Sequence, residues 1–138
     1  MRKSWLGKVG ALALAGGVAQ ATHALETPVQ VQQRWEGRVP AGVAPPPQSS
    51  LVAADALQVV WTLCQVQSPM PDIDFSRQIV LLAVRKGVKV RFQNAQVADG
   101  NVRTNVLATM APAAQTFCAL ALVDRAGIKT VNGAPLGQ

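Results

Sequence analysis

Two stretches of unbroken apolar sequence, Ile79–Val84 (IVLLAV) and Phe117–Val123 (FCALALV), decide the fold class of this chain. A strand with one wet face alternates apolar and polar residues, whereas a continuous apolar run indicates a strand buried on both faces. We therefore expect the two runs to be the central strands of a sheet that is covered on both sides.

The segment between these runs has the pattern of a hairpin with one wet face. Residues 88–93 (VKVRFQ) alternate apolar and polar side chains, as a half-buried strand does. The alternation slips at positions 94 and 95, where a β-bulge would return Val97 to the inner side. Asp99-Gly100 is a tight-turn signal that leads into a second strand over Asn101–Thr109. A further short strand is expected at Ile128–Val131.

One helix is predicted before the first apolar run. Its apolar residues recur at i, i+3, i+4 and i+7 and form a single stripe of Leu57, Val60, Trp61 and Cys64. Asp55 suits the first turn of such a helix, because a negative charge there complements the helix dipole. The segment Ser68–Pro71 (SPMP) stops it. The stripe is expected to pack into the core.

The order of these elements predicts an α+β fold, in which a mostly antiparallel sheet of about five to six strands, curled or sandwich-like, packs on one α-helix. One helix can cover only one face of the sheet. The second face must be closed by curling of the sheet, by the N-terminal segment, or by a partner, and the sequence leaves these three alternatives open.

The N-terminal residues have the features of a cleaved export signal. Three basic residues precede the short apolar run Val9–Val18, and small residues at positions 19 and 21 favour cleavage after Ala21, with a cut after Ala24 as the alternative. The apolar run is shorter than the ~20 residues of a membrane-spanning helix. Cleavage after Ala21 would remove three of the 13 basic residues and no acidic one, which halves the formal net charge of +6. We therefore expect a periplasmic or secreted protein without a membrane anchor.

The 138 residues suffice for one domain. We divide the chain into a signal peptide (1–21), an N-terminal strand and proline-rich loop (22–50), an α+β core domain (51–133) and a short tail (134–138). The strand is predicted from the alternation over residues 29–36 (VQVQQRWE), and the loop from Pro45-Pro46-Pro47 and its neighbours.

Cys64 and Cys118 are the two cysteines of the chain. In an exported protein an even number of cysteines favours a disulfide bond, which would stabilise a domain of this size by about 4 kcal/mol. The alternative is a pair of inert, buried thiols. With neither a C-x-x-C pair nor a cluster of histidines, we expect no redox or metal site and no cofactor.

The inventory of catalytic side chains is poor. The chain has no tyrosine, one histidine (His23), no G-x-S-x-G elbow and no glycine-rich phosphate loop in the expected mature part. Asp72 and Asp74 could form a carboxylate pair or a calcium site, but calcium requires six to eight oxygen ligands. We expect Asp74 to cap a turn while Phe75 enters the core. The chain is therefore not expected to be an enzyme.

Basic residues gather in the predicted hairpin. Lys89, Arg91 and Arg103 are candidates for binding an anionic partner, such as an acidic protein surface, a lipid headgroup or a cell-wall polymer. The alternative is a solvated face whose lysine protects a sheet edge from aggregation. Nucleic acid is not an expected partner, because Phe92 points away from the basic face and leaves no platform on which bases could stack.

A tryptophan-bearing helix, the turn Pro71–Phe75 (PDIDF) and an apolar strand follow one another here, and the chain closes with Arg125–Gly133 (RAGIKTVNG). This arrangement resembles the exported PrcB-like protease-complex stability domains and their uncharacterised relatives, over about residues 50–133. The resemblance implies a non-enzymatic module that stabilises or accompanies an exported protease. A T-G-G-Y segment typical of that family is replaced by Arg85–Val88 (RKGV), so no functional residue is carried over.

We therefore expect a small, exported, non-enzymatic binding or stability module for another envelope or secreted protein, with a protease as one kind of partner. The alternative is an inhibitor or envelope-surface ligand that acts through the basic face of the hairpin. The sequence does not predict the oligomeric state.

Overall fold

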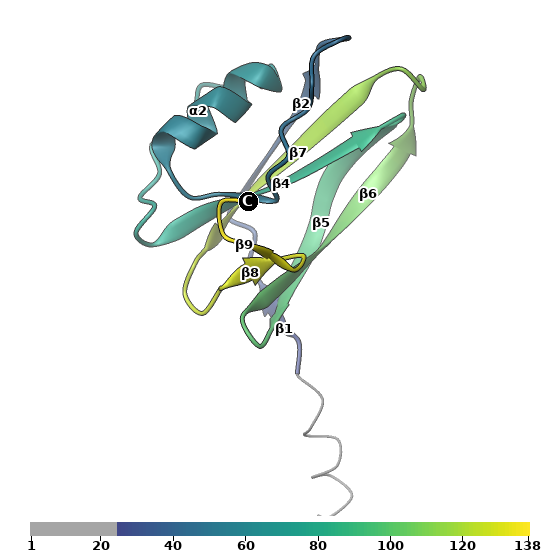
Figure 1. The fold of residues 1–138 in the computed structure, drawn as a ribbon. Helices are drawn as coiled ribbons and strands as arrows, with labels where there is room; N and C mark the ends of the chain where they lie inside the picture. The colour runs from purple at the N-terminus through teal and green to yellow at the C-terminus, as the bar shows by residue number, and fades with distance from the viewer. Residues whose placement is uncertain (1–24) are drawn as a thin grey trace, which may run out of the picture.

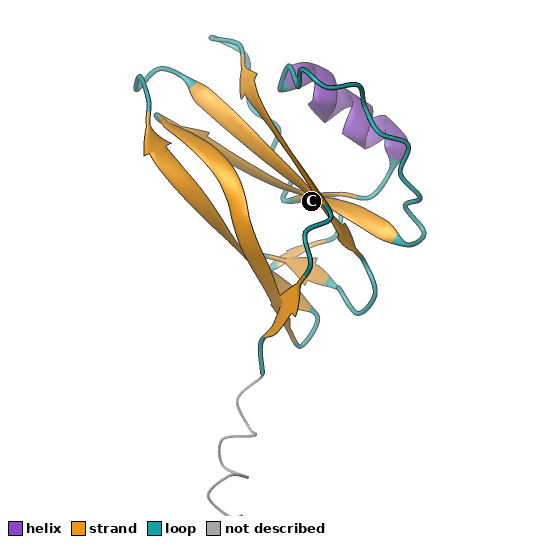
Figure 2. Cartoon of the chain, turned by 180° about the vertical axis from the view of Figure 1, so that it is seen from behind, coloured by secondary structure: helices purple, strands orange, loops and turns teal. Residues whose placement is uncertain are grey.

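The computed structural model describes residues 25–138, so the predicted signal peptide lies outside the described residues. Within them the chain forms three layers: one helix, a four-stranded sheet and a five-stranded sheet (Figure 1). The helix α2 (Ala54–Leu63) lies against the four-stranded sheet, which we call the central sheet, and the five-stranded outer sheet covers its other face (Figure 2).

The central sheet has the strand order β2-β7-β4-β3 and is built from β2 (Gln33–Val39), β7 (Thr116–Asp124), β4 (Gln78–Lys86) and β3 (Ser50–Leu51). The outer sheet has the order β1-β5-β6-β8-β9 and is built from β1 (Thr27–Val29), β5 (Val88–Ala98), β6 (Asn101–Met110), β8 (Thr130–Val131) and β9 (Ala134–Pro135). Neighbouring strands are antiparallel, except that β8 runs parallel to β6.

This architecture confirms the predicted α+β class, a mostly antiparallel β structure with one helix in the described residues. It contains more strands than the five to six expected. The additional ones are β1, β3 and β9, each of two or three residues, which is too short to show an apolar period.

The two apolar runs are β4 and β7, and they lie side by side at the centre of the central sheet, as predicted. Alternate side chains of each strand point to opposite layers. In β4, Val80 and Leu82 pack with the helix, whereas Ile79 and Leu81 pack with the outer sheet. Both faces are dry, which explains why neither run alternates.

Side-chain size differs between the two faces of β7. In the middle of the strand the helix side carries Cys118, Leu120 and Leu122, while the outer-sheet side carries Ala119 and Ala121, flanked by Phe117 and Val123. The small residues leave room for Phe92 of β5, the largest fully buried side chain among the described residues, which belongs to the same apolar cluster. Ala119, Ala121 and Phe92 are all buried in this cluster, as close packing between the two sheets requires.

The helix α2 forms where the apolar stripe predicted it. Leu57, Val60 and Trp61 are buried, and Asp55 lies in the first turn. Cys64 is the C-cap residue and is disulfide-bonded to Cys118 of β7, with Cα atoms 6.2 Å apart. The predicted disulfide is therefore present, and it joins the end of the helix to β7, near the start of that strand.

The end of the helix also explains a glycine in β2. The Cys64 carbonyl oxygen accepts a hydrogen bond of 2.7 Å from the Arg38 N–H. A Cβ atom on Gly37 would overlap that carbonyl oxygen. Glycine is therefore required at position 37 for close approach of the helix end and β2.

The single strand predicted from the alternation over residues 29–36 is divided in two. β1 pairs with β5 in the outer sheet, and β2 pairs with β7 in the central sheet. Residues 30–32 connect the two sheets. The alternation of apolar and polar residues does not reveal this change of sheet, because it continues unchanged from β1 into β2.

The outer sheet covers the second face of the central sheet. Its core is the β5–β6 hairpin, whose turn residues Asp99 and Gly100 have φ angles of 51° and 80°, as a tight turn requires. The register shifts between Phe92 and Asn94, just before positions 94 and 95, where the sequence predicts a bulge, and Ala95 beyond it is buried. No helix within residues 25–138 is long and apolar enough to cross a membrane.

Candidate functional site

The three basic residues singled out in the sequence do not gather at one place. Lys89 and Arg91 project from the outer face of β5, where they lie opposite Thr109 and Leu107 of β6. Arg103 lies farther along β6 and forms an ion pair with Glu26. The structure therefore separates an unpaired Lys89/Arg91 group from an Arg103 that has an acidic neighbour.

A groove runs beside Lys89 and Arg91, between β5 and the edge strand β2. It consists of two adjoining hollows of about 390 and 260 Å³ that share Glu36, Lys89 and Val90. The larger hollow extends over Arg91, Leu107, Ala108 and Thr109. The smaller one extends over Gly37, Arg38, Gln65, Gln67 and Phe117. We call the two hollows together the β2–β5 groove.

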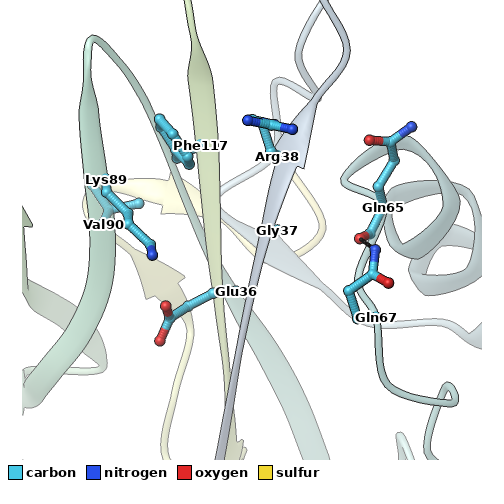
Figure 3. A pocket seen from close by; sticks show the side chains of 8 residues that line it. All are labelled: Glu36, Gly37, Arg38, Gln65, Gln67, Lys89, Val90 and Phe117. Atoms are coloured by element: carbon cyan, nitrogen blue, oxygen red, sulfur yellow. Dashed lines mark hydrogen bonds between the residues drawn. The ribbon is translucent and has the colours of Figure 1, made fainter. Parts of the chain in front are cut away.

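Figure 3 shows the smaller hollow from close by. The Lys89 and Glu36 side chains project toward each other from opposite walls, and Phe117 of β7 lies between the two strands. The Gln67 side chain donates a hydrogen bond of 3.1 Å to the Gln65 carbonyl on the helix side. The groove thus has a mixed lining of an aromatic ring, amides and charges of both signs.

One wall of the groove is the open edge of β2. The Arg38 N–H points away from β7, because it donates to the Cys64 carbonyl. Main-chain groups alternate in direction along a strand, so those of Glu36 also point away from β7. Within residues 25–138 no strand pairs with β2 on that side. The main chain at Glu36 is therefore free to bind an added strand.

The other wall is the open half of β5. The short strand β1 pairs only with Ala95–Val97, which leaves the part of β5 that precedes the bulge without a neighbour on that side. Arg34 of β2 reaches across and donates hydrogen bonds to the carbonyl oxygens of Phe92 (3.0 Å) and Gln93 (3.2 Å). This guanidinium joins the two walls at one end of the groove.

Charge in the groove is incompletely paired. In the described part of the chain, the one ion pair within 4.0 Å is that of Arg103 and Glu26. Lys89 and Arg91 therefore form no ion pair, and both side chains are exposed to solvent. An extended polypeptide with carboxylates could meet open main-chain groups and these two cations in the same place.

The Asp72/Asp74 pair has a structural arrangement. The Asp74 carboxylate accepts hydrogen bonds from the Ser76 hydroxyl (2.6 Å) and the Ser76 N–H (3.1 Å). These bonds, with the nearby charge of Arg77, lower the pKa of Asp74 below its usual value of 3.8. Phe75 packs against the apolar cluster around the helix. This is the turn cap expected from the sequence.

No group of three or more histidine, cysteine, aspartate or glutamate side chains that could hold a metal ion occurs in residues 25–138. No protein-family model, curated protein or solved structure matches this chain. The resemblance to the PrcB-like domains therefore stays a prediction.

Sequence reasoning missed Glu36, Leu107 and Phe117 as groove residues. The alternation in the N-terminal strand placed Glu36 on a polar face, but nothing in the sequence shows that β2 pairs with β7 or that its edge faces β5. Phe117 was assigned to the core as part of an apolar run, and it is in fact only partly buried at the open end of the sandwich.

Proposed function

We propose that this chain is a non-catalytic binding module of the periplasm or the extracellular space, which docks an extended segment of another exported protein in the β2–β5 groove. The observation that carries the proposal is the juxtaposition of two open strand edges with unpaired Lys89 and Arg91. Main-chain hydrogen bonds supply affinity in such strand addition, and side chains supply specificity. A protease or another envelope protein would be stabilised by the contact.

The disulfide between Cys64 and Cys118 supports the proposed location, because such bonds persist in oxidising compartments. The proposed absence of catalysis agrees with the chemistry of the groove. Its acidic residue, Glu36, is exposed, and the one carboxyl with a clearly shifted pKa, that of Asp74, caps a turn elsewhere.

The test compares three variants of the processed protein in cross-linking and affinity capture from the extracytoplasmic fraction. Glu36→Pro removes an edge N–H of β2, and Lys89→Glu/Arg91→Glu reverses the basic pair. Arg77→Glu/Lys129→Glu is the matched control, because it changes net charge equally at exposed positions outside the groove. A strand-adding module loses its partner with Glu36→Pro and keeps it with the control. Retention of the partner by Glu36→Pro would contradict the proposal.

A second candidate is an inhibitor or envelope-surface ligand that binds through Lys89 and Arg91 alone. It is favoured by the exposure of these two side chains and the absence of an ion-pair partner among the described residues. Electrostatic binding of this kind weakens steeply with salt. It predicts that Lys89→Glu/Arg91→Glu abolishes binding and its salt dependence, whereas Glu36→Pro leaves both unchanged.

A further inference from the structure

The second half of β6 is an edge without the usual protection. β8 pairs with β6 only at Asn101 and Val102, and Figure 1 shows the rest of β6 at the margin of the molecule. Natural edge strands are blunted by charges, by proline or by short length. The β2 edge carries Arg34, Glu36 and Arg38, but the sequence from Thr104 through Val123 contains no charged residue.

The direction of the free main-chain groups follows from the hydrogen bonds at the protected half of β6. Asn132 N–H donates to the Val102 carbonyl (2.7 Å), and the Thr104 N–H donates to the Asn132 side chain (3.1 Å). Main-chain groups on alternate residues point the same way. Those of Val106, Ala108 and Met110 therefore also point to the open side, where no strand of residues 25–138 pairs with them.

The side chains of the same three residues are poorly covered. They continue the inner face of the outer sheet, but Val106 is only half-buried, Ala108 is exposed, and Met110 is 89% exposed. On the opposite face Leu107 is 42% exposed. An added strand would therefore gain main-chain bonds and cover apolar surface on both faces.

We infer that this edge pairs with the same edge of a second copy of the chain, antiparallel and centred on Ala108. The three residues with open main-chain groups are symmetric about Ala108, so one copy's Val106, Ala108 and Met110 would lie opposite Met110, Ala108 and Val106 of the other. Each of these is a hydrogen-bonded pair in an antiparallel ladder. The two outer sheets would join into one continuous sheet across a two-fold axis.

Charge selects a second copy over a charged partner at this edge. On the outer face Leu107 would lie opposite Thr109 of the second copy, and no charged side chain enters the contact. Arg91, which pairs with Leu107 across β5 and β6, would be three strands from the second copy's Lys89, about 14 Å at the usual strand spacing. Over that distance salt screens the repulsion between two basic molecules.

The experiment measures the mass of the processed protein by sedimentation across a concentration series. The wild type is expected to be a dimer at the upper end of the series. Ala108→Lys and Ala108→Glu each place like charges opposite one another at the two-fold axis, and each should weaken dimerisation at least about tenfold. Val59→Lys is the matched control, because Val59 of the helix is exposed and lies away from the edge; it should stay dimeric.

The decisive measurement is a mixture of the Ala108→Lys and Ala108→Glu proteins, which should restore a dimer because opposite charges then meet. Hydrogen exchange supplies a test without mutation: the amides of Val106, Ala108 and Met110 should become protected as concentration rises. A wild type that stays monomeric throughout, an Ala108→Lys protein that dimerises as tightly as the wild type, or a mixture that associates no better than either variant alone would overturn the inference. Lys89→Glu/Arg91→Glu should remain dimeric, because neither side chain enters the contact, although Leu107, Ala108 and Thr109 also line the larger hollow of the groove.

Discussion

The central sheet is covered by two layers that are attached to it in different ways. The helix layer is joined covalently to β7 by the Cys64–Cys118 bond, in addition to its apolar packing. The outer sheet is held by apolar packing around Phe92 and by the hydrogen bonds of Arg34. The helix layer is thus attached by a covalent bond, whereas the outer sheet is attached by non-covalent contacts alone.

The two layers also differ in what they leave open. Helix α2 satisfies its own main chain and buries its apolar stripe, so the helix layer has little to offer a partner beyond the single exposed Val59. The outer sheet contributes to both the β2–β5 groove and the unprotected half of β6. Both proposed binding surfaces therefore involve the outer sheet, whereas the helix layer contributes chiefly its buried apolar stripe and the disulfide bond.

Removing the disulfide should have the largest effect on this comparison. The bond spans a sequence separation of 54, and its loss in Cys64→Ala/Cys118→Ala is expected to lower the free energy of unfolding by about 4 kcal/mol. Urea unfolding measures the total. Hydrogen exchange should show that amides of α2 lose more protection than those of β5, and equal losses in both layers would contradict the assignment of the bond to the helix layer.

A smaller effect is expected where the outer sheet meets β2. Arg34→Gln removes a guanidinium that donates to the carbonyl oxygens of Phe92 and Gln93, and should cost about 1 kcal/mol because the site is partly solvated. Arg91→Gln is the matched control, since Arg91 is exposed and donates no side-chain hydrogen bond in the structure. Equal unfolding midpoints in urea for the two variants would show that the Arg34 contact contributes nothing.

The smallest effect concerns the exposed turn before β4. The Ser76 hydrogen bonds lower the pKa of Asp74 below its ordinary value of 3.8. The ionised carboxylate therefore stabilises the folded state at pH values above 3.8, and this contribution is lost as the pH falls through the lowered pKa. Unfolding of the wild type should therefore show a small acid-dependent loss that is reduced in Asp74→Asn. Asp72→Asn removes a carboxylate that accepts no hydrogen bond in the structure, and is the matched control for the change of charge at this turn.

The long elements could be predicted from the sequence because the number of buried faces determines the pattern of apolar residues along each of them. The continuous runs of β4 and β7 and the stripe of Leu57, Val60 and Trp61 each report the number of buried faces directly. The change of sheet between β1 and β2 could not be predicted, because alternation records which residues face inward and not which strand lies alongside. The two-residue strands are too short to carry a period at all.

The candidate site was less accessible to sequence reasoning than the fold. Lys89 and Arg91 were found because charge alternates with Val90 and Phe92 along β5. Glu36 is distant in the chain and reaches the same groove only because β2 is an edge strand. In the sequence, the second half of β6 has the pattern of an ordinary hairpin strand. Its edge is open because β8 pairs with only two residues of β6, which the sequence does not show.

The pairing of β2 with β7 has a consequence for the order of events during folding. These strands come from the beginning and the end of the described chain, and they align along seven residues, from Gln33 opposite Leu122 to Val39 opposite Thr116. Contacts between such distant segments close large loops and form slowly. The central sheet cannot be completed until β7 is available, so a chain that emerged from a narrow passage with its N-terminus first could not form this sheet until residues 116–124 had arrived.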